Sequence, residues 1–284
     1  MKFFKNALAI TKVILAAGLL ASCQNEKDAD ISPVTEQAEK PNNQKANVAF
    51  FYKRLVNDGT VKLEYSGPNK IISKEYHPSK SKFIGYNYTV TNQITAVKYN
   101  TASQKLIETS VYSLNAEGKC SESKHYDPYM PDIAVVFRYQ YNSNGQLEKV
   151  YRKDSPNLRQ EFTYIGNNLE KVKFFDNKNT LVKQLTYYYY YSLKDNSKLN
   201  PTFLANGQGK YLPIFGSFSI NLVQKVNETT FKYEPFNTST IYHVFKYKHY
   251  KDGDFNDGEI KTVEEIIGGT TILTERKYTA LGIL

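Results

Sequence analysis

One acidic stretch of this 284-residue chain has spacing that could bind a metal ion. Asp252, Asp254 and Asn256 match the first, third and fifth positions of an EF-hand calcium loop. The sixth position is Asp257 where such a loop needs Gly, and the twelfth is Val263 where it needs Glu. The stretch therefore predicts a polar hairpin turn, or a calcium site of looser geometry, rather than an EF-hand.

The histidines and the familiar catalytic motifs also fail to form a site. His243 and His249 share one face of an expected strand but would lie about 20 Å apart, too far to share a zinc ion. A phosphate-binding loop is missing because Gly209-Lys210-Tyr211 lacks the upstream Gly spacing and the hydroxyl after Lys. Residues 216–220 fail the last position of G-x-S-x-G. We expect no catalytic residues, metal or cofactor, and no enzyme; a hydrolase with carboxylates distant in sequence stays the alternative.

The chemistry that the sequence does support belongs to Cys23. Residues 1–22 begin with lysines and continue with an apolar run over 13–21, which is typical of a secretory signal peptide. The run is shorter than the roughly 20 residues that span a bilayer. Leu20-Ala21-Ser22-Cys23 resembles the bacterial lipobox, which implies that Cys23 receives lipid and becomes the first residue of the mature chain.

Residues 23–48 read as a polar, disordered linker after that cysteine. They contain Pro33 and Pro41, no aromatic residue and few apolar ones, so they cannot bury enough surface to offset the entropy of ordering. The acidic residues of 24–30 resemble the export signal of surface lipoproteins of the Bacteroidota type. Together these features predict an outer-membrane location with a lipid anchor and exposure on the cell surface.

Composition excludes several functions for the remaining chain. The formal net charge is +9, but the lysines are scattered over nearly every expected strand, which disfavours a nucleic-acid partner. If Cys23 is lipidated, Cys120 has no disulfide partner, and we expect a buried or half-buried strand thiol rather than a nucleophile. The 24 tyrosines and 16 phenylalanines favour β-strands.

Hairpins recur along residues 49–284, which we expect to form one domain. In 135–153 alternating apolar positions flank Asn144-Gly145, a strong hairpin signal. Other turns are expected at 57–59, 67–69, 154–157 and 177–179. Aligning Tyr88, Tyr112, Tyr139, Tyr164 and Tyr188 gives a period of about 25 residues, or one hairpin per repeat.

Short turns make neighbouring strands antiparallel, and a sheet of more than about 10 strands rarely stays open. We therefore expect an all-β antiparallel meander of about sixteen strands, curled into a barrel or a deeply curved half-barrel. In 185–193 five consecutive tyrosines break the alternation. Tyr187, Tyr189 and Tyr191 are the candidate binding residues, for a glycan or an envelope protein.

A long irregular insertion at about 193–221 interrupts the rhythm. It contains Pro201, Gly207 and Pro213 together with apolar residues that would not be left in water. The stretch is either a crossover that fills the concave side of the sheet or a lid over a ligand cleft.

The Y-x-Y…N-G-x-L-x-K-V pattern of 139–150, the meander and the lipobox together resemble Bacteroidota-type lipoproteins of unknown function with a porin-like fold. The unit in 137–150 also resembles the tyrosine-rich repeats of large bacterial surface proteins. The resemblance implies a β-barrel-like fold in the cell envelope and supplies no activity to transfer to this chain. We expect a non-catalytic binding or structural module held at the membrane by lipid. The alternatives are a hydrolase acting on envelope polysaccharide and an integral outer-membrane barrel, which charged strands such as 169–175 disfavour.

Overall fold

The computed structural model describes residues 53–66, 71–195, 197, 199–201, 209–233, 235–249 and 259–280. The expected signal peptide, Cys23, the expected linker and the acidic stretch 251–258 lie outside the described residues, as does the expected turn at 67–69. The described chain contains one short 3-10 turn, Pro78–Lys80, and no helix with the length and hydropathy to cross a membrane.

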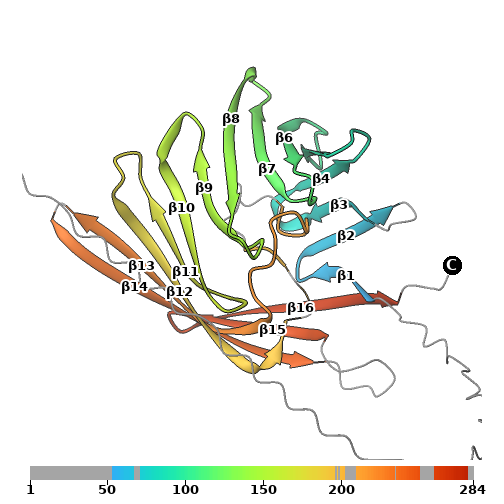
Figure 1. Ribbon diagram of the computed structural model, residues 1–284. Helices are drawn as coiled ribbons and strands as arrows, with labels where there is room; N and C mark the ends of the chain where they lie inside the picture. The colour runs from blue at the N-terminus through green and yellow to red at the C-terminus, as the bar shows by residue number, and fades with distance from the viewer. Residues whose placement is uncertain are drawn as a thin grey trace, which may run out of the picture. The chain divides into compact units, whose positions relative to one another are not determined.

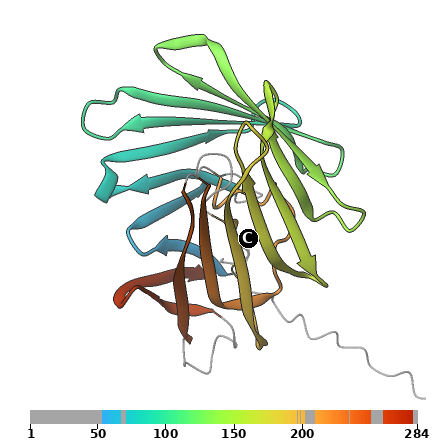
Figure 2. The ribbon, with the colours of Figure 1, turned by 90° about the vertical axis from the view of Figure 1, so that its left-hand side faces the viewer.

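Strands β1 to β16 follow one another around a closed antiparallel barrel (Figures 1 and 2). The predicted all-β meander is confirmed, and the sheet closes instead of stopping at a half-barrel, because β16 returns to pair with β1. The strands are β1 (Lys53–Asp58), β2 (Val61–Ser66), β3 (Ile71–His77), β4 (Lys82–Asn87), β5 (Gln93–Asn100), β6 (Leu106–Leu114), β7 (Cys120–Asp127), β8 (Met130–Tyr141), β9 (Leu147–Arg152), β10 (Ser155–Ile165), β11 (Asn168–Phe175), β12 (Leu181–Lys194), β13 (Asn221–Tyr233), β14 (Phe236–His249), β15 (Ile260–Ile267) and β16 (Thr270–Ala280).

The turns show both the strength and the limit of the hairpin prediction. At Asn144-Gly145 the chain turns with Gly145 at φ +71, and the Gly145 N–H donates to the Asn142 carbonyl at 2.9 Å. The turn expected over 154–157 is wrong in extent, because β10 already begins at Ser155. The ladder between β9 and β10 shifts register after Ser155, and this irregularity accommodates Pro156, which has no N–H to donate.

Six inward tyrosine hydroxyls make one recurring contact. Each donates to a backbone carbonyl on the adjacent preceding strand, over 2.5 to 2.9 Å. Each acceptor lies where a ladder shifts register, so the tyrosine supplies a donor at a point where the regular hydrogen bonding is interrupted. The pairs are Tyr65–Leu55, Tyr88–Ile72, Tyr141–Cys120, Tyr164–Leu147, Tyr189–Leu169 and Tyr247–Val223.

Alternation along β12 decides which of its tyrosines faces inward. Tyr188, the last of the aligned tyrosines, lies opposite Lys225 and is 42% exposed, whereas Tyr189 is 7% exposed. Successive side chains of a strand point to opposite faces, and the ladder shift beside this pair places its extra residue on β13 and leaves the alternation of β12 unchanged. The period of about 25 residues therefore tracks the hairpins but not a single side-chain position.

The longest described part of the insertion, residues 209–220, packs inside the ring of strands (Figure 1, orange). Leu212, Ile214, Phe215 and Phe218 join the buried core. The Cys120 N–H donates to the Ile214 carbonyl at 2.7 Å, and the Leu169 N–H donates to Phe218 at 2.7 Å. We call residues 209–220 the plug; it fills part of the barrel and leaves a cavity beside it.

Candidate functional site

A cavity of about 600 Å³ lies inside the barrel, next to the plug. Its walls come mainly from β12 to β16, and its remaining side from the plug and from insertion residues 195, 197 and 199–201. The volume is in the range of small-molecule binding sites. The side chains that face it fall into an aromatic and apolar wall and two polar clusters.

The first polar cluster is centred on His243. Its Nδ1 lies 2.9 Å from Glu265 Oε1 and its Nε2 lies 3.8 Å from Glu228 Oε2. Lys183 Nζ lies 3.4 Å from the other oxygen of Glu228. These four side chains come from β12, β13, β14 and β15, and each is 19 to 33% exposed, so water within the cavity reaches them.

The second polar cluster ties the plug to the seam of the barrel. Asp58 of β1 accepts hydrogen bonds from Arg276 Nε of β16 at 2.8 Å, from Tyr211 Oη at 2.9 Å and from Lys210 Nζ at 2.5 Å. Burial alone would raise the pKa of Asp58, but Lys210 and Arg276 outweigh it and lower that pKa to about 2. The carboxylate of Asp58 already accepts hydrogen bonds from three protein side chains, so the His243 cluster is the better partner for a ligand.

Aromatic side chains form much of the remaining wall. Tyr187, Tyr189, Phe245 and Tyr247 all line the cavity. Burial raises the pKa values of the three phenols, so these hydroxyls stay protonated and can donate hydrogen bonds. The Tyr189 hydroxyl already donates to Leu169 and lies 2.7 Å from Ser219 Oγ.

The three tyrosines predicted for binding do not form one strip. Tyr187 and Tyr189 line the cavity, whereas Tyr191 is 73% exposed and does not. The charged residues around His243 were not among the predicted site residues. The inward position of Glu228 and His243 follows from their alternation with Val226 and Phe245, and it can be inferred only once those two apolar residues are known to face the core.

A second constellation on the opposite wall has the composition of a hydrolase triad. His125 Nε2 lies 2.9 Å from Ser123 Oγ, and its Nδ1 lies 3.3 Å from Glu108. Ser123 is fully buried, its hydroxyl also contacts Tyr139 Oη at 2.9 Å, and none of these side chains lines the cavity. Since no substrate can reach Ser123, the group is a buried polar network that connects strands.

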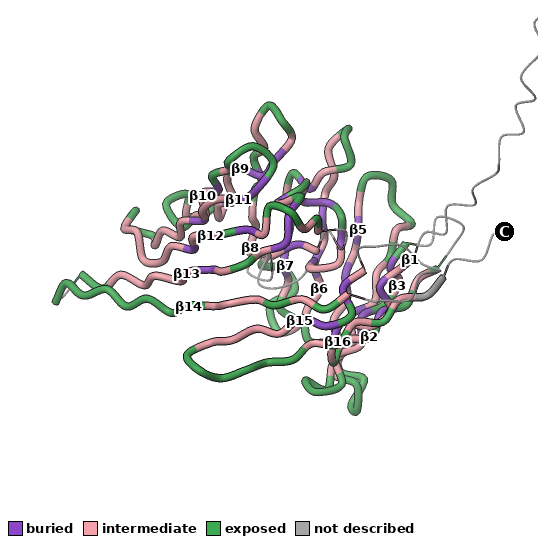
Figure 3. Tube along the Cα trace, turned by 90° about the horizontal axis from the view of Figure 1, so that it is seen from below, coloured by how far each residue is buried: buried purple, intermediate pink, exposed green. Residues whose placement is uncertain are grey.

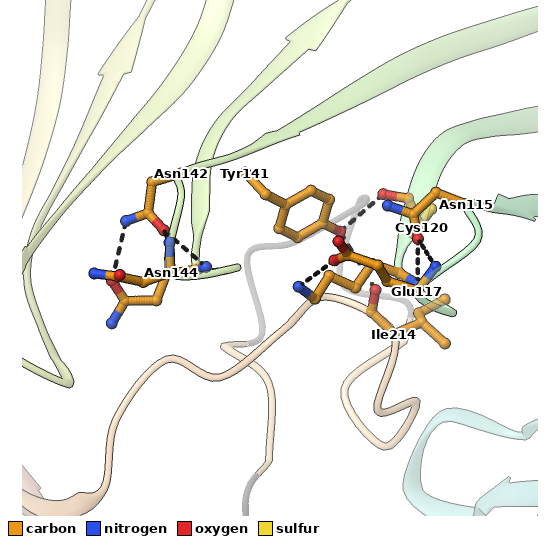
Figure 4. Close-up of polar contacts among 9 residues, drawn as sticks. Asn115, Glu117, Cys120, Tyr141, Asn142, Asn144 and Ile214 are labelled. Carbon is orange, nitrogen blue, oxygen red and sulfur yellow. Dashed lines mark hydrogen bonds and ion pairs between the residues drawn. The ribbon is translucent and has the colours of Figure 1, made fainter.

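Cys120 is a buried strand thiol, as predicted. It is fully buried, and burial raises its pKa above the ordinary value. The Tyr141 hydroxyl donates to the Cys120 carbonyl at 2.8 Å and contacts the Ile214 carbonyl at 3.3 Å (Figure 4). The surroundings of Cys120 therefore fasten the plug and offer no route for a nucleophile.

A smaller hollow, lined by the turns that hold Asn115 and Asn142, is less suited to a ligand (Figure 4). Asn115 Oδ1 accepts from the N–H groups of Glu117 and Lys119, and Asn142 Oδ1 accepts from the N–H of Asn144. These side chains are occupied by their own turns. Among the described residues no group of three His, Cys, Asp or Glu side chains could hold a metal ion.

Comparison with known proteins shows the fold. No family model and no curated protein matches the chain. A porin-like protein from Bacteroides uniformis superimposes with a TM-score of 0.52 at 14% sequence identity, over 81% of this chain and 96% of that protein. A porin-like protein from Bacteroides vulgatus aligns with a TM-score of 0.43 at 14% identity, over 80% of this chain and 100% of that protein.

Proposed function

We propose that this chain is a lipid-anchored protein of the outer membrane whose water-facing barrel binds a small hydroxyl-rich ligand, such as a short glycan, in its interior cavity. In this proposal the chain binds the ligand without transforming it. The carrying observation is the cavity in which Glu228, His243 and Glu265 lie beside Tyr187 and its neighbouring aromatic side chains.

The chemistry of the cavity fits a sugar better than a purely apolar ligand. Carboxylates such as Glu228 and Glu265 accept hydrogen bonds from hydroxyl groups, and Lys183 donates them. Tyrosine and phenylalanine rings offer flat faces for the C–H surface of a sugar ring. A ligand in this place would exchange hydrogen bonds with water for hydrogen bonds with a preformed polar cluster.

The outer wall supports a barrel that faces water. On β7 and β8, Glu122 and Arg138 pair at 3.4 Å on the face opposite the buried Ser123 and Tyr139. On β10, Arg159 and Glu161 pair at 2.7 Å on the face opposite Phe162. A lipid-facing band disfavours such charges, which argues against the integral-barrel alternative.

The anchor and the envelope location rest on the N-terminal sequence, with support from the neighbour in Bacteroides uniformis that is described as porin-like. Palmitate labelling should mark the wild type and not Cys23→Ala, and protease added to intact cells should remove the wild-type barrel. Lack of label on the wild type, or full protection from the protease, would count against the anchor or the surface location respectively.

The ligand class is tested on a glycan array with the full chain carrying Cys23→Ala. Glu265→Gln keeps the shape of the side chain but removes its charge within the cavity, and it should weaken binding at least tenfold, by about 1.4 kcal/mol. Glu161→Gln on the outer wall is the matched control and should bind like the parent chain. Equal binding by both variants would place the ligand elsewhere.

A second candidate function is hydrolysis of an envelope polysaccharide. The observation that favours it is the convergence of Glu228 and Glu265 on the His243 imidazole inside the cavity. One carboxyl group would protonate the leaving glycosidic oxygen while the other activates the water that attacks the sugar. Mass spectrometry of array ligands after incubation separates the candidates: shortened glycans indicate hydrolysis, and intact bound glycans indicate binding alone.

A further inference from the structure

The hairpin of β13 and β14 projects beyond its neighbours (Figures 1 and 3). The ladder between β12 and β13 ends at Lys183 and Thr230, and the ladder between β14 and β15 begins only at His243 and Ile267. Residues 236–242 of β14 therefore pair with β13 on one side and with no described strand on the other.

This free edge lacks the features that normally protect an edge strand. Its sequence is Phe-Asn-Thr-Ser-Thr-Ile-Tyr, with no charged residue and no proline, and all seven residues are exposed. Phe236 is 70% and Tyr242 is 55% exposed. Natural edge strands are usually short, bulged or charged, because an open edge offers its N–H and C=O groups to any other strand. An unprotected edge of seven residues is thus suited to pairing.

We propose that this edge pairs in antiparallel fashion with the same edge of a second copy of the chain, about a two-fold axis at Ser239. In that register Ser239 lies opposite its own copy, Thr238 opposite Thr240, and Phe236 opposite Tyr242. Residues 236, 238, 240 and 242 share one face of the strand, so both aromatic pairs form on the same side of the joined sheet.

The segment favours its own copy over an unrelated strand because its pattern is nearly symmetric about Ser239. Aromatic residues stand at both ends and small hydroxyl residues at the centre. Self-pairing thus joins aromatic to aromatic side chains at both ends, and with no charges present it creates no like-charge contact. The hairpin projects past β15, so the edge at 236–242 extends beyond the end of its neighbouring strand in the same barrel.

Charge substitution at the axis gives the sharpest test, in the full chain with Cys23→Ala. Sedimentation over a concentration series should show a monomer–dimer equilibrium for the parent chain. Ser239→Lys and Ser239→Asp should each be monomeric, because each places like charges face to face. An equimolar mixture of the two should regain dimers, since the opposite charges then meet across the axis.

Cross-linking provides an independent readout. Under mild oxidation Ser239→Cys should form a disulfide dimer, whereas Thr163→Cys, an exposed position on the outer wall, should not. A parent chain that is monomeric at every concentration, or a dimer that survives Ser239→Lys, would overturn the proposal. So would a monomer in which the amides of 236–242 that point away from β13 resist hydrogen exchange, because another segment of the same chain would then cover the edge.

Discussion

The hydroxyl of Tyr164 donates a hydrogen bond to the backbone carbonyl of Leu147 at 2.9 Å, at the point where the ladder between β8 and β9 shifts register. The same contact recurs at five other hairpins, so six of the 24 tyrosines of this chain share one structural role. Each hydroxyl compensates one interruption of the sheet, and the interruptions bend the strands into a closed ring.

Replacing Tyr164 with Phe should therefore destabilise the barrel. The change removes one hydrogen bond and leaves the Leu147 carbonyl without this donor, which should lower the free energy of unfolding by about 1 kcal/mol. Urea denaturation measures the effect. Tyr191→Phe is the control, since that side chain is 73% exposed and its loss should change stability by less than about 0.5 kcal/mol. Equal effects of the two variants would remove the proposed role of the inward hydroxyls.

The Asp58 cluster predicts a pH dependence. The pKa of Asp58 is lowered from 3.8 to about 2 in the folded chain, so the folded state binds fewer protons than the unfolded state in this window. Its contribution, about 2 kcal/mol, is present above the unfolded pKa and is lost as the pH falls from about 4 to about 2.

Asp58→Asn should accordingly lower stability by about 3 kcal/mol at neutral pH, because Arg276 and Lys210 lose their partner. The difference from wild type should shrink as the pH falls through this window. Asp154→Asn, which removes an exposed ion pair with Arg152, should leave the stability close to that of the wild type at every pH. A stability difference between wild type and Asp58→Asn that stays constant as the pH falls to about 2 would contradict the assignment of Asp58 as the titrating group.

The plug can be tested at a glycine. Gly216 has φ +81, and an added Cβ would lie 2.8 Å from the Gly145 carbonyl oxygen. Gly118 has φ +74 but open space around it. Both alanine variants bear the cost of a left-handed backbone, about 1 kcal/mol. Only Gly216→Ala adds a steric clash, and its unfolding free energy should fall by a further 1 kcal/mol or more, about the lower end of overpacking costs. If both variants lose the same stability, the plug does not press against the turn at Gly145.

Cys120 offers a probe of how tightly the barrel is closed. In the chain with Cys23→Ala the buried thiol should resist N-ethylmaleimide in buffer and react once urea unfolds the protein, because burial blocks access and raises its pKa. Thr163→Cys supplies an exposed reference thiol that should react at once. Prompt labelling of Cys120 in the folded chain would show that this end of the barrel opens.

The strands, their antiparallel order and most turns could be predicted because they depend on local signals. The Asn144-Gly145 turn and the alternation on each side of it suffice for one hairpin. Closure could not be predicted, since β1 meets β16 across nearly the whole domain, and no local pattern distinguishes a closed ring from an open one.

The site was harder to foresee than the fold. The cavity cluster depends on which residues of β12 to β15 face inward. The ladder shifts opposite Tyr188 and Lys248 place an extra residue on β13 and on β15, which changes the alternation within those two strands. His243 was considered only together with His249, whereas its partners in space are Glu228 and Glu265, on the neighbouring strands. One sequence signal could have identified these glutamates: each is a charged residue on the face of its strand that otherwise carries apolar residues.

The most direct test of the account is a calorimetric titration of the best glycan from the array into the chain with Cys23→Ala and into three variants of it. Binding by the parent chain, weakened at least tenfold in Glu228→Gln and Glu265→Gln and unchanged in Tyr191→Ala, is the predicted result. Two results would contradict the proposal that the interior cavity is the functional site. One is glycan affinity that is unchanged in both Glu228→Gln and Glu265→Gln, and the other is that the parent chain binds none of the glycans tried.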